Sequence, residues 1–363
     1  MLKSVNVLDL SRVLAGPLAT MLLGDLGANV VKVERPGSGD DTRGWGPPFD
    51  AAGESAYYLS VNRNKKSLAA DLGDPSDREL IRSLIASADV VVDNFKRGML
   101  AKNGFDLAAL LAEHPQLVWC TITGFGPESD RAGYDFVVQA EQGWMAITGD
   151  ENGAPMKVGV ALADVVAGKD ACIAILAALV ARGRTGRGRH VTVSLAASAS
   201  AALVNVAQNA LVSGEEPRRW GNGHPNLVPY QLFEASDRAL VIAVGNDAQW
   251  GACARALGLH TLGADPRLLT NAGRIAERGR VIATMTARIA ERSAATWIAA
   301  LDRAGVPCGV VRTVLESLRD IDASAATGVS PSVPGTVRMP PPKLDEHGME
   351  IRAHGWNAFA PVR

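Results

Sequence analysis

The sequence predicts a two-domain α/β protein whose larger domain is Rossmann-like. Three observations lead to this prediction. The chain has 363 residues, enough for two domains of roughly 150 residues each. Its first half alternates short β-branched runs with helical patterns, which is typical of a parallel sheet covered by helices. A shift in composition near Arg219 then indicates a second, smaller α/β region.

The first domain should contain several parallel strands, predicted at residues 5–10, 29–34, 89–93, 118–123 and 190–195. Residues 18–27 carry apolar side chains at helical spacing, and Gly27 suits a helix stop, which predicts a β-α-β unit. Residues 171–180 are apolar on every face, so we expect a buried helix from about Val165 to Arg182. The Arg- and Gly-rich residues 183–189 then read as a solvated turn.

The second domain should alternate strands and helices: strands at 230–234, 239–244 and 310–313, and helices at 249–257, 275–289 and 294–304. From Ser330 several prolines predict an extended segment. We therefore expect a large domain over residues 1–218, completed by the C-terminal segment 321–363. The small α/β domain should cover residues 219–320.

The composition of the chain argues against several classes of partner and site. Lys and Arg total 37 against 38 Asp and Glu, for a formal net charge of −1, which argues against a nucleic-acid partner. The chain opens with no leader-peptide pattern and contains no run of about 18 uninterrupted apolar residues, so we expect a cytoplasmic protein without a membrane partner. The 4 cysteines lie far apart, so we expect neither a disulfide framework nor a metal site.

The β-α-β unit ends with the acidic residue Glu34 and so suggests a dinucleotide site. Its first turn argues against that function. A dinucleotide-binding turn needs G-x-G-x-x-G, whereas residues 10–17 read Leu-Ser-Arg-Val-Leu-Ala-Gly-Pro, with a single glycine. A nicotinamide-dependent dehydrogenase is therefore disfavoured.

Two acidic positions are candidates for chemistry. Asp164 stands at the start of the predicted buried helix, where it suits an N-cap. The helix dipole and amides would there hold the carboxylate ionised, and an ionised carboxylate can be a nucleophile, so both roles are compatible. Asp135 and Glu141 form a second acidic cluster, suited to acid/base work, although the pattern alone favours a loop that ends in an Asp cap for a helix from Val137.

Seven stretches in a fixed order identify a family. They are residues 7–10 with 14–17 (VLDL, LAGP), 24–28 with 33–40 (GDLGA, VERPGSGD), 42–45 (TRGW), 62–67 (NRNKKS), 93–95 (DNF), 123–126 (TGFG) and 159–168. With them the chain resembles the family III CoA-transferases, also called the CaiB/BaiF or formyl-CoA transferase family. The resemblance extends from Val7 to about Cys308.

The resemblance implies a mechanism and an assembly. Asp164, at the family's nucleophile position, would pass through an aspartyl anhydride and an aspartyl-CoA thioester in a ping-pong exchange between an acyl-CoA and a carboxylic acid. Coenzyme A would be a substrate, and neither a metal nor a redox cofactor is implied. The family fold is an interlocked homodimer in which each ring-shaped chain threads the other.

The resemblance also implies binding residues. For coenzyme A they are Val13, Leu14, Ala15, Arg35, Ala70, Asp71 and Leu72 (the last three expected as a strand), Asn94, Phe95, Lys96, Lys102, Tyr134 and Asp135. For the substrate and a mobile glycine-rich lid they are Trp45, Gly221, Asn222, Gly223 and His224. Lys65 and Lys66 are interpreted as a solvated turn outside the site.

Two branches of the family and a third possibility stay open. Racemase relatives that epimerise 2-methylacyl-CoA esters have His where this chain has Tyr134, and a phenol is a poor base at neutral pH, so a transferase is favoured. The alternatives are such a racemase and a catalytically silent CoA-binding homologue. The chain looks closer to the branch that uses succinyl-CoA with dicarboxylates such as glutarate or malate. Candidate cations for the distal carboxylate are Arg43, Arg218, Arg219 and His224.

Overall fold

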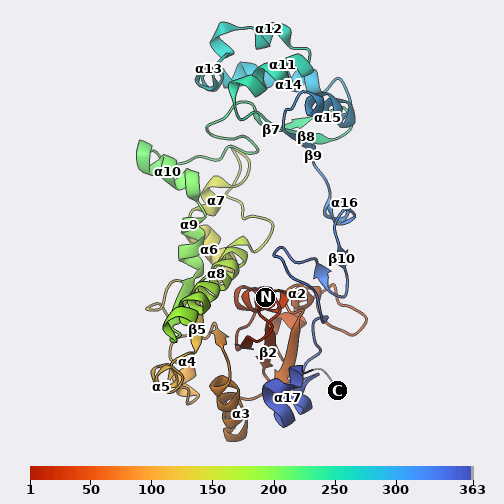
Figure 1. Ribbon diagram of the computed structural model, residues 1–363. Helices are drawn as coiled ribbons and strands as arrows, with labels where there is room; N and C mark the ends of the chain where they lie inside the picture. Colours follow the sequence, from red (N-terminus) through yellow and green to blue (C-terminus); the bar gives the residue numbers. More distant parts are fainter. Residues whose placement is uncertain (361–363) are drawn as a thin grey trace. The chain divides into compact units, whose positions relative to one another are not determined.

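A computed structural model describes residues 1–360 of the chain, which form two compact units (Figure 1). Unit 1 comprises residues 1–145, residues 157–215 and the chain from residue 321 onward. Unit 2 comprises residues 146–156 and 216–320. It thus includes residues 146–156, which the sequence pattern assigns to the larger domain.

Unit 1 is built on a six-stranded parallel sheet with the order β3-β2-β1-β4-β5-β6. The strands are β1 (Asn6–Asp9), β2 (Asn29–Glu34), β3 (Lys65–Ala69), β4 (Val90–Asp93), β5 (Val118–Thr123) and β6 (His190–Ser194). All of them except β3 are predicted correctly from the sequence. The expected strand at Ala70–Leu72 is wrong, because β3 has already ended at Ala69.

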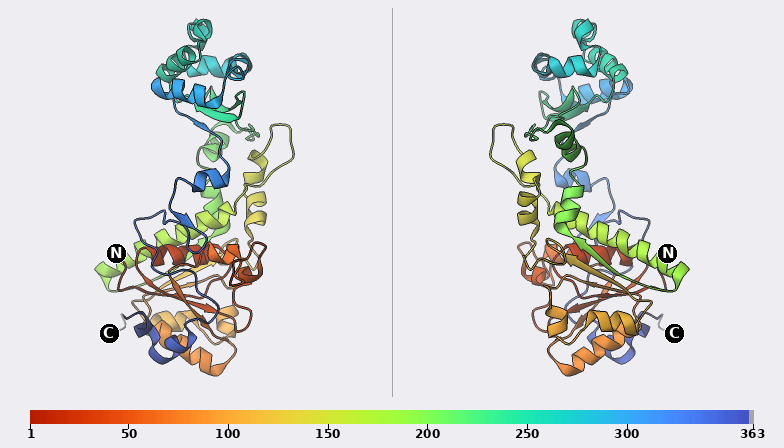
Figure 2. Two further views of the ribbon diagram at one scale, coloured as in Figure 1. Left: turned by 90° about the vertical axis from the view of Figure 1, so that its right-hand side faces the viewer. Right: turned by 90° about the vertical axis from the view of Figure 1, so that its left-hand side faces the viewer.

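Helices cover both faces of this sheet (Figure 2). On one face, α1 (Ala15–Asp25) and α8 (Leu162–Thr185) share a core with inward-facing strand residues such as Val30 and Val118. On the other face, α3 (Pro75–Ala86), α5 (Leu107–Glu113) and α17 (Gly348–His354) pack on residues such as Val31 and Trp119. The other helices of unit 1 are α2 (Ala56–Leu59), α4 (Met99–Lys102), α6 (Asp135–Glu141), α9 (Leu195–Ala201) and α10 (Val204–Ser213).

Gly27 ends the first β-α-β unit as predicted, with a left-handed φ of 108°. The expectation that the long helix is buried all round is wrong. In α8 the side chains of Ile173 and Val180 are 64% and 61% exposed, because only one side of the helix packs on α1 and the sheet. Gly168 makes that packing close: a Cβ atom there would lie 2.7 Å from the carbonyl oxygen of Ala15.

The C-terminal segment after residue 330 has little regular structure and packs on unit 1. The amide of Asn64 donates to the carbonyl of Met339 at 3.0 Å, and the amide of Thr336 donates to the carbonyl of Asp25 at 3.0 Å. The guanidinium of Arg338 donates to the carbonyl of Gly24, near the end of α1, and to that of Ala28, directly before β2. Backbone hydrogen bonds of this kind tie the segment to the part of the chain that precedes β3.

Unit 2 contains a three-stranded antiparallel sheet of β7 (Tyr230–Glu234), β8 (Ala239–Ala243) and β9 (Cys308–Val310). Its helices are α7 (Trp144–Ile147, shared with unit 1), α11 (Asp247–Ala256), α12 (His260–Gly263), α13 (Asn271–Ala276), α14 (Arg278–Ile289), α15 (Ala294–Arg303) and α16 (Val314–Leu318). The single helix predicted over 275–289 is instead parts of α13 and α14, which separate at Glu277.

Within residues 1–360, no single helix combines the length and apolar character needed to cross a membrane. The pair α9 and α10 meets that test only as a unit bent by 70°. The test considers only length and composition, and buried core helices also pass it.

Candidate active site

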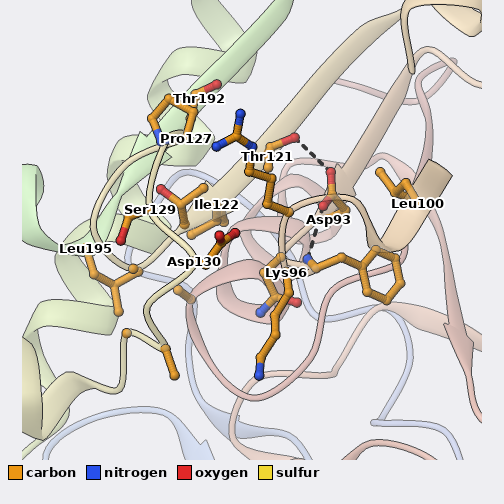
Figure 3. Close-up of a pocket in the computed structure, with 18 of the residues that line it drawn as sticks. Asp93, Lys96, Leu100, Thr121, Ile122, Pro127, Ser129, Asp130, Thr192 and Leu195 are labelled. Carbon is orange, nitrogen blue, oxygen red and sulfur yellow. Dashed lines mark hydrogen bonds between the residues drawn. The ribbon is translucent and has the colours of Figure 1, made fainter. Parts of the chain in front are cut away.

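A cavity of about 530 Å³ lies where the carboxyl ends of β1, β4 and β5 meet (Figure 3). The strand order reverses between β1 and β4. In open parallel sheets, ligands bind in the crevice at this reversal point. The fold therefore places the cavity where a Rossmann-like domain binds its ligand, although the glycine-rich dinucleotide turn is missing.

The cavity collects predicted residues from four separate segments. Those that line it are Val13, Leu14, Ala15, Asn94, Phe95, Lys96, Tyr134 and Asp164. A second cavity of about 320 Å³ is lined by Arg35, Ala70, Asp71 and Leu72. Phe95 lines both cavities, so the two adjoin. Lys102 lines neither of them, and lies at the end of α4 between lining residues of both.

Arg12 is a site residue that the sequence analysis missed. It lines both cavities, and its Nη1 pairs with Asp41 Oδ2 at 3.1 Å, while Arg35 pairs with the other oxygen of the same carboxylate. Its buried Nε has no hydrogen-bond partner among the described residues. The signal in the sequence is an arginine directly before the predicted CoA-binding residues Val13, Leu14 and Ala15, because a guanidinium suits the phosphates of coenzyme A.

Asn94 lines the cavity but uses its amide group on the protein. Its Oδ1 accepts from the amide of Arg12 at 2.9 Å, and its Nδ2 donates to the carbonyl of Arg12 at 2.7 Å. This two-way contact joins the segment after β4 to the turn after β1. The Asn94 side chain therefore positions the cavity wall in this structure.

A chain of hydrogen bonds fixes another part of the cavity wall (Figure 3). The buried carboxylate of Asp93 accepts from Trp119 Nε1 at 2.7 Å and from Thr121 Oγ1 at 2.8 Å. Thr121 Oγ1 also lies 2.9 Å from Nε2 of His190. Burial raises the pKa of Asp93 and lowers that of His190. These hydrogen bonds link β4, β5 and β6 at the polar wall of the cavity, and the Asp93 carboxylate is used on Trp119 and Thr121.

The interpretation of Asp164 as a helix N-cap is wrong. Asp164 is the third residue of α8, whose N-cap position is Ala161. The cap comes from a distant segment instead: Asp135 Oδ1 accepts from the amide of Ala163 at 2.8 Å. Asp135 is also the first residue of α6, so the expected cap for a helix from Val137 is wrong as well. Two separate segments thus meet at the start of α8.

The carboxylate of Asp164 lacks a hydrogen-bond donor within residues 1–360 of this structure. Burial raises its pKa to about 7, and the negative charge of Asp135 contributes to this rise. The expectation that helix amides hold this carboxylate ionised is therefore wrong. Near neutral pH the group is divided between a neutral and an ionised form, so a small change in its surroundings changes its charge.

Tyr57 is a second residue that the sequence analysis missed. Burial raises the pKa of its phenol to about 12, and the negative charges of Asp164, Asp135 and Asp40 add to this effect. Tyr57 therefore carries a protonated hydroxyl in the electrostatic field of Asp164. The ring of Trp45 packs edge-on against it at a centroid distance of 5.1 Å. Trp45 does not line either cavity, so this contact is its link to the site.

Two cationic expectations are wrong. Arg43 was a candidate for substrate binding, but its buried guanidinium binds Glu34 through Nε and Nη2, both at 2.8 Å, and also contacts Glu54 and Tyr58. The solvated turn expected at Lys65 and Lys66 is strand β3 instead. Lys65 is fully buried, with Nζ 3.0 Å from Asp9 Oδ2, and Lys66 is largely buried, with Nζ 2.6 Å from Glu350 Oε2. All three cations pair with the protein's own carboxylates.

The predicted lid residues Gly221, Asn222, Gly223 and His224 belong to unit 2. Gly221 has a left-handed φ of 55°. Beyond it, the guanidinium of Arg278 donates to the carbonyls of His224 at 3.0 Å and Pro225 at 2.9 Å. The loop is thus held at its end and glycine-rich at its start. Within residues 1–360 no cluster of three or more His, Cys, Asp or Glu side chains could hold a metal ion.

Comparison with known proteins adds an independent observation. The family model "CoA-transferase family III" matches residues 2–353. The chain is 42% identical to the succinate–glutarate CoA-transferase of Agrobacterium fabrum, over 97% of this chain and 95% of that protein. It is 41% identical to the human succinyl-CoA:glutarate CoA-transferase, over 96% of this chain and 85% of that protein. The crystal structure of a CaiB/BaiF family protein from Brucella suis superposes with a TM-score of 0.85 at 42% identity, covering 97% of this chain and 98% of that chain.

Proposed function

This chain belongs to CoA-transferase family III, and from that premise we propose that it moves CoA from succinyl-CoA to a dicarboxylic acid such as glutarate, with Asp164 as the nucleophile. Membership of this family supports the class of reaction, which is CoA transfer. The named activities of the Agrobacterium fabrum and human relatives support the choice of donor and acceptor. The assignment of the nucleophile rests on one observation: Asp164 is a partly buried carboxylate on the wall of the larger cavity, and no described residue donates a hydrogen bond to it.

The proposed reaction begins at the ionised Asp164. One carboxylate oxygen attacks the thioester carbonyl of succinyl-CoA, the C–S bond breaks, and CoA leaves as its thiolate. The thiolate then attacks the aspartyl carbonyl of the mixed anhydride, succinate leaves, and an aspartyl-CoA thioester remains. The acceptor carboxylate reverses the two steps, which releases the new acyl-CoA and returns Asp164 as a carboxylate. Atoms and charges balance without a metal or an external oxidant.

The surroundings of Asp164 suit this sequence of steps. A carboxylate that accepts no hydrogen bonds from the protein is a stronger nucleophile than a well-solvated one. Asp135 keeps the start of α8 in place through its bond to the amide of Ala163. Tyr57 stays protonated near neutral pH and so can donate to an oxygen atom that gains negative charge.

The two cavities indicate which part of coenzyme A the other predicted residues would contact. The cavity beside Asp164 suits the thioester end of CoA, with Lys96 on its wall. The cavity with Arg35 and Ala70–Leu72 suits the nucleotide end. For the distal carboxylate of the acceptor, Arg43 is excluded because its buried guanidinium is bound by Glu34 and Glu54. This leaves Arg218, Arg219 and His224 as candidates; Arg218 pairs with Glu151, but both of these side chains are more than half exposed. The loop Gly221–His224 is proposed as the lid.

A second copy of the chain is the partner that we propose, in the interlocked ring arrangement of the family. Apolar side chains on α8 and α10 support it: Ile173, Val180, Leu211 and Val212 are each more than 60% exposed in a single chain. Exposed apolar side chains that gather on the surface are typical of an interface with another chain. Light scattering coupled to size-exclusion chromatography should give the mass of two chains, and a monomer at micromolar concentration would contradict the proposal.

The central test traps the acyl-enzyme. Incubation with succinyl-CoA and hydroxylamine should convert the Asp164 side chain to a hydroxamate, which peptide mass spectrometry detects. Asp170, on the same helix and bonded to Ser198 Oγ at 2.6 Å, is the internal control and should stay unmodified. Transfer should be measured in parallel with a panel of mono- and dicarboxylates. An unmodified Asp164 during turnover would overturn the nucleophile assignment, and turnover of monocarboxylates alone would overturn the substrate assignment.

A further inference from the structure

The turn between β1 and α1 is anchored by buried side chains along its backbone. The amide of Ser11 donates to Asp9 Oδ1 at 3.0 Å, and the carbonyl of Ser11 accepts from Lys32 Nζ at 3.0 Å. Arg12 is held on both sides by Asn94, as described above. This turn forms the wall of the larger cavity through Val13, Leu14 and Ala15. Its conformation therefore decides the shape of the space beside Asp164.

Val13 has an unfavourable backbone conformation. Its φ is 72°, in the left-handed region that β-branched residues avoid. Such a conformation persists only where surrounding contacts impose it. The contact at Val13 is the carboxylate of Asp40, whose two oxygens accept the Val13 amide at 3.3 Å and 3.2 Å. The backbone amide of Val13 is thus held by one charged group, the carboxylate of Asp40.

We propose that Asp40 is a positioning residue for the CoA-transfer reaction: it holds Val13 in the left-handed conformation, and so keeps Val13, Leu14 and Ala15 in place on the wall of the cavity that Asp164 also lines. The effect on the transfer rate rests on the proposed function. The effect on the conformation of the turn, measured by hydrogen exchange, does not depend on catalysis.

Asp40 is itself held as an ionised and immobile group. Its side chain is fully buried and pairs with Lys32 Nζ at 2.9 Å. Its Oδ1 also accepts from the amide of Thr42 at 3.0 Å and from Thr42 Oγ1 at 2.8 Å. Burial alone would raise its pKa, but the charge of Lys32 and the Thr42 bonds lower it. The anchor is therefore present over the whole neutral pH range.

A merely architectural role for Asp40 makes a different prediction from a positioning role. Asp25 shows the architectural case: its buried carboxylate pairs with Arg63 Nη2 at 2.7 Å and lies at the far end of α1 from the turn. If Asp40 acts only through stability, its replacement should resemble that of Asp25. If it acts by restraining Val13, the effect should depend on which residue stands at position 13, because glycine adopts a positive φ without strain.

The experiment compares Asp40→Asn in two backgrounds, wild type and Val13→Gly, in steady-state transfer from succinyl-CoA to glutarate. In the wild-type background we expect kcat to fall by about ten- to a hundredfold, the range that release of one strained residue allows. In the Val13→Gly background we expect the further loss to be less than about threefold. Equal losses in the two backgrounds would overturn the proposal.

Hydrogen exchange supplies a readout that needs no turnover. In the wild-type background, Asp40→Asn should speed exchange in the peptide spanning residues 11–16 by at least about tenfold. It should also weaken binding of free coenzyme A in calorimetry. Asp25→Asn should leave exchange in that peptide unchanged, even where it lowers the melting temperature. Unchanged exchange in Asp40→Asn would overturn the proposal. The expected exchange pattern in a chain without transferase activity would instead overturn the proposed function alone.

A milder variant keeps the test usable if Asp40→Asn fails to fold. Thr42→Val removes one hydroxyl donor to Asp40 and leaves the Lys32 pair intact. It should lower kcat by about two- to threefold in the wild-type background, as the loss of one hydrogen bond allows, and have no effect in the Val13→Gly background. The same loss in both backgrounds would contradict the positioning role.

Discussion

Asp9 and Asp164 are carboxylates of the same unit, on elements that share one core, but their surroundings are opposite. Asp9, at the end of β1, lies 3.0 Å from Lys65 Nζ and accepts bonds from Ser11 and Thr20. Burial alone would raise its pKa, but Lys65, Lys32 and these bonds lower it to about 2. Asp164 has no cation or donor among the described residues, and its pKa is raised to about 7.

The difference separates architecture from chemistry. Buried ion pairs such as Asp9–Lys65, Asp40–Lys32 and Glu34–Arg43 fix the backbone that surrounds the cavity. A carboxylate neutralised in this way is a poor nucleophile, because its charge is already shared with a cation. Asp164 keeps its charge unshared at the cavity wall, where the sheet and turns around it are held by the paired groups. The following predictions test this division.

The largest effect should come from the unpaired carboxylate. Asp164→Asn removes the proposed nucleophile while it keeps the shape of the side chain, and kcat should fall by at least about 10⁴-fold. A CoA-transfer assay measures it, with Asp170→Asn on the same helix as the control. Retention of more than about one per cent of the wild-type rate would show that Asp164 does not form the covalent intermediate.

The paired group should instead dominate stability. Lys65→Met leaves the buried carboxylate of Asp9 without its nearest cation, so the free energy of unfolding should fall by about 3–5 kcal/mol. Urea denaturation monitored by circular dichroism measures the change. Arg97→Met breaks an ion pair with Glu128 in which both side chains are more than half exposed, and should cost at most about 1 kcal/mol. Similar losses for the two variants would contradict the proposed importance of burial.

The approach of α8 to the turn after β1 should show a smaller effect. Gly168→Ala places a Cβ atom 2.7 Å from the carbonyl of Ala15, so it should destabilise the protein by about 1–3 kcal/mol and lower the transfer rate. Gly183, on the same helix, has no atom within 4 Å of such a Cβ atom. Gly183→Ala should therefore raise stability by about 0.5–1 kcal/mol. Thermal unfolding distinguishes the two, and a stabilising Gly168→Ala would refute the close contact.

The smallest effect should be a shift in pH dependence. In the proposed mechanism the ionised form of Asp164 is the nucleophile. Burial raises the pKa of Asp164 to about 7, so kcat/KM should rise as the pH increases through about 7. Asp135→Asn removes the neighbouring negative charge that favours the protonated form, so this rise should move to lower pH. Burial, the larger cause, persists in the variant, so the rise should stay above the range of an ordinary carboxyl group.

The pH profile has a matched control in Glu141, on the same helix α6. It is exposed, pairs with Arg131 and is not among the groups that shift the pKa of Asp164. Glu141→Gln should therefore leave the pH profile where it is. A shift of equal size in Glu141→Gln and Asp135→Asn would show that the profile reports a general change of charge.

The positions of most strands of the large sheet, and the place of Asp164 near the start of α8, are properties of the sequence. β-Branched runs predict β1, β2, β4 and β5 because buried parallel strands need such residues on both faces. Seven short stretches in order indicate the family, and with it Asp164 and the predicted CoA-binding residues, most of which line the two cavities. Local patterns suffice for these features because each depends on neighbours along the chain.

The electrostatic state of those residues was decided only by the tertiary structure. The polar residues at the start of β3 do not suggest a buried strand. They form one because Lys65 pairs with Asp9, which lies 56 residues earlier in the chain. Asp135 caps α8 across 28 residues, which leaves Asp164 inside the first turn with a raised pKa instead of at the cap. Whether a charged side chain is solvated, paired or left alone depends on what lies opposite it in space. A pattern along the chain therefore predicts where Asp164 stands, and only the folded chain decides how basic its carboxylate is.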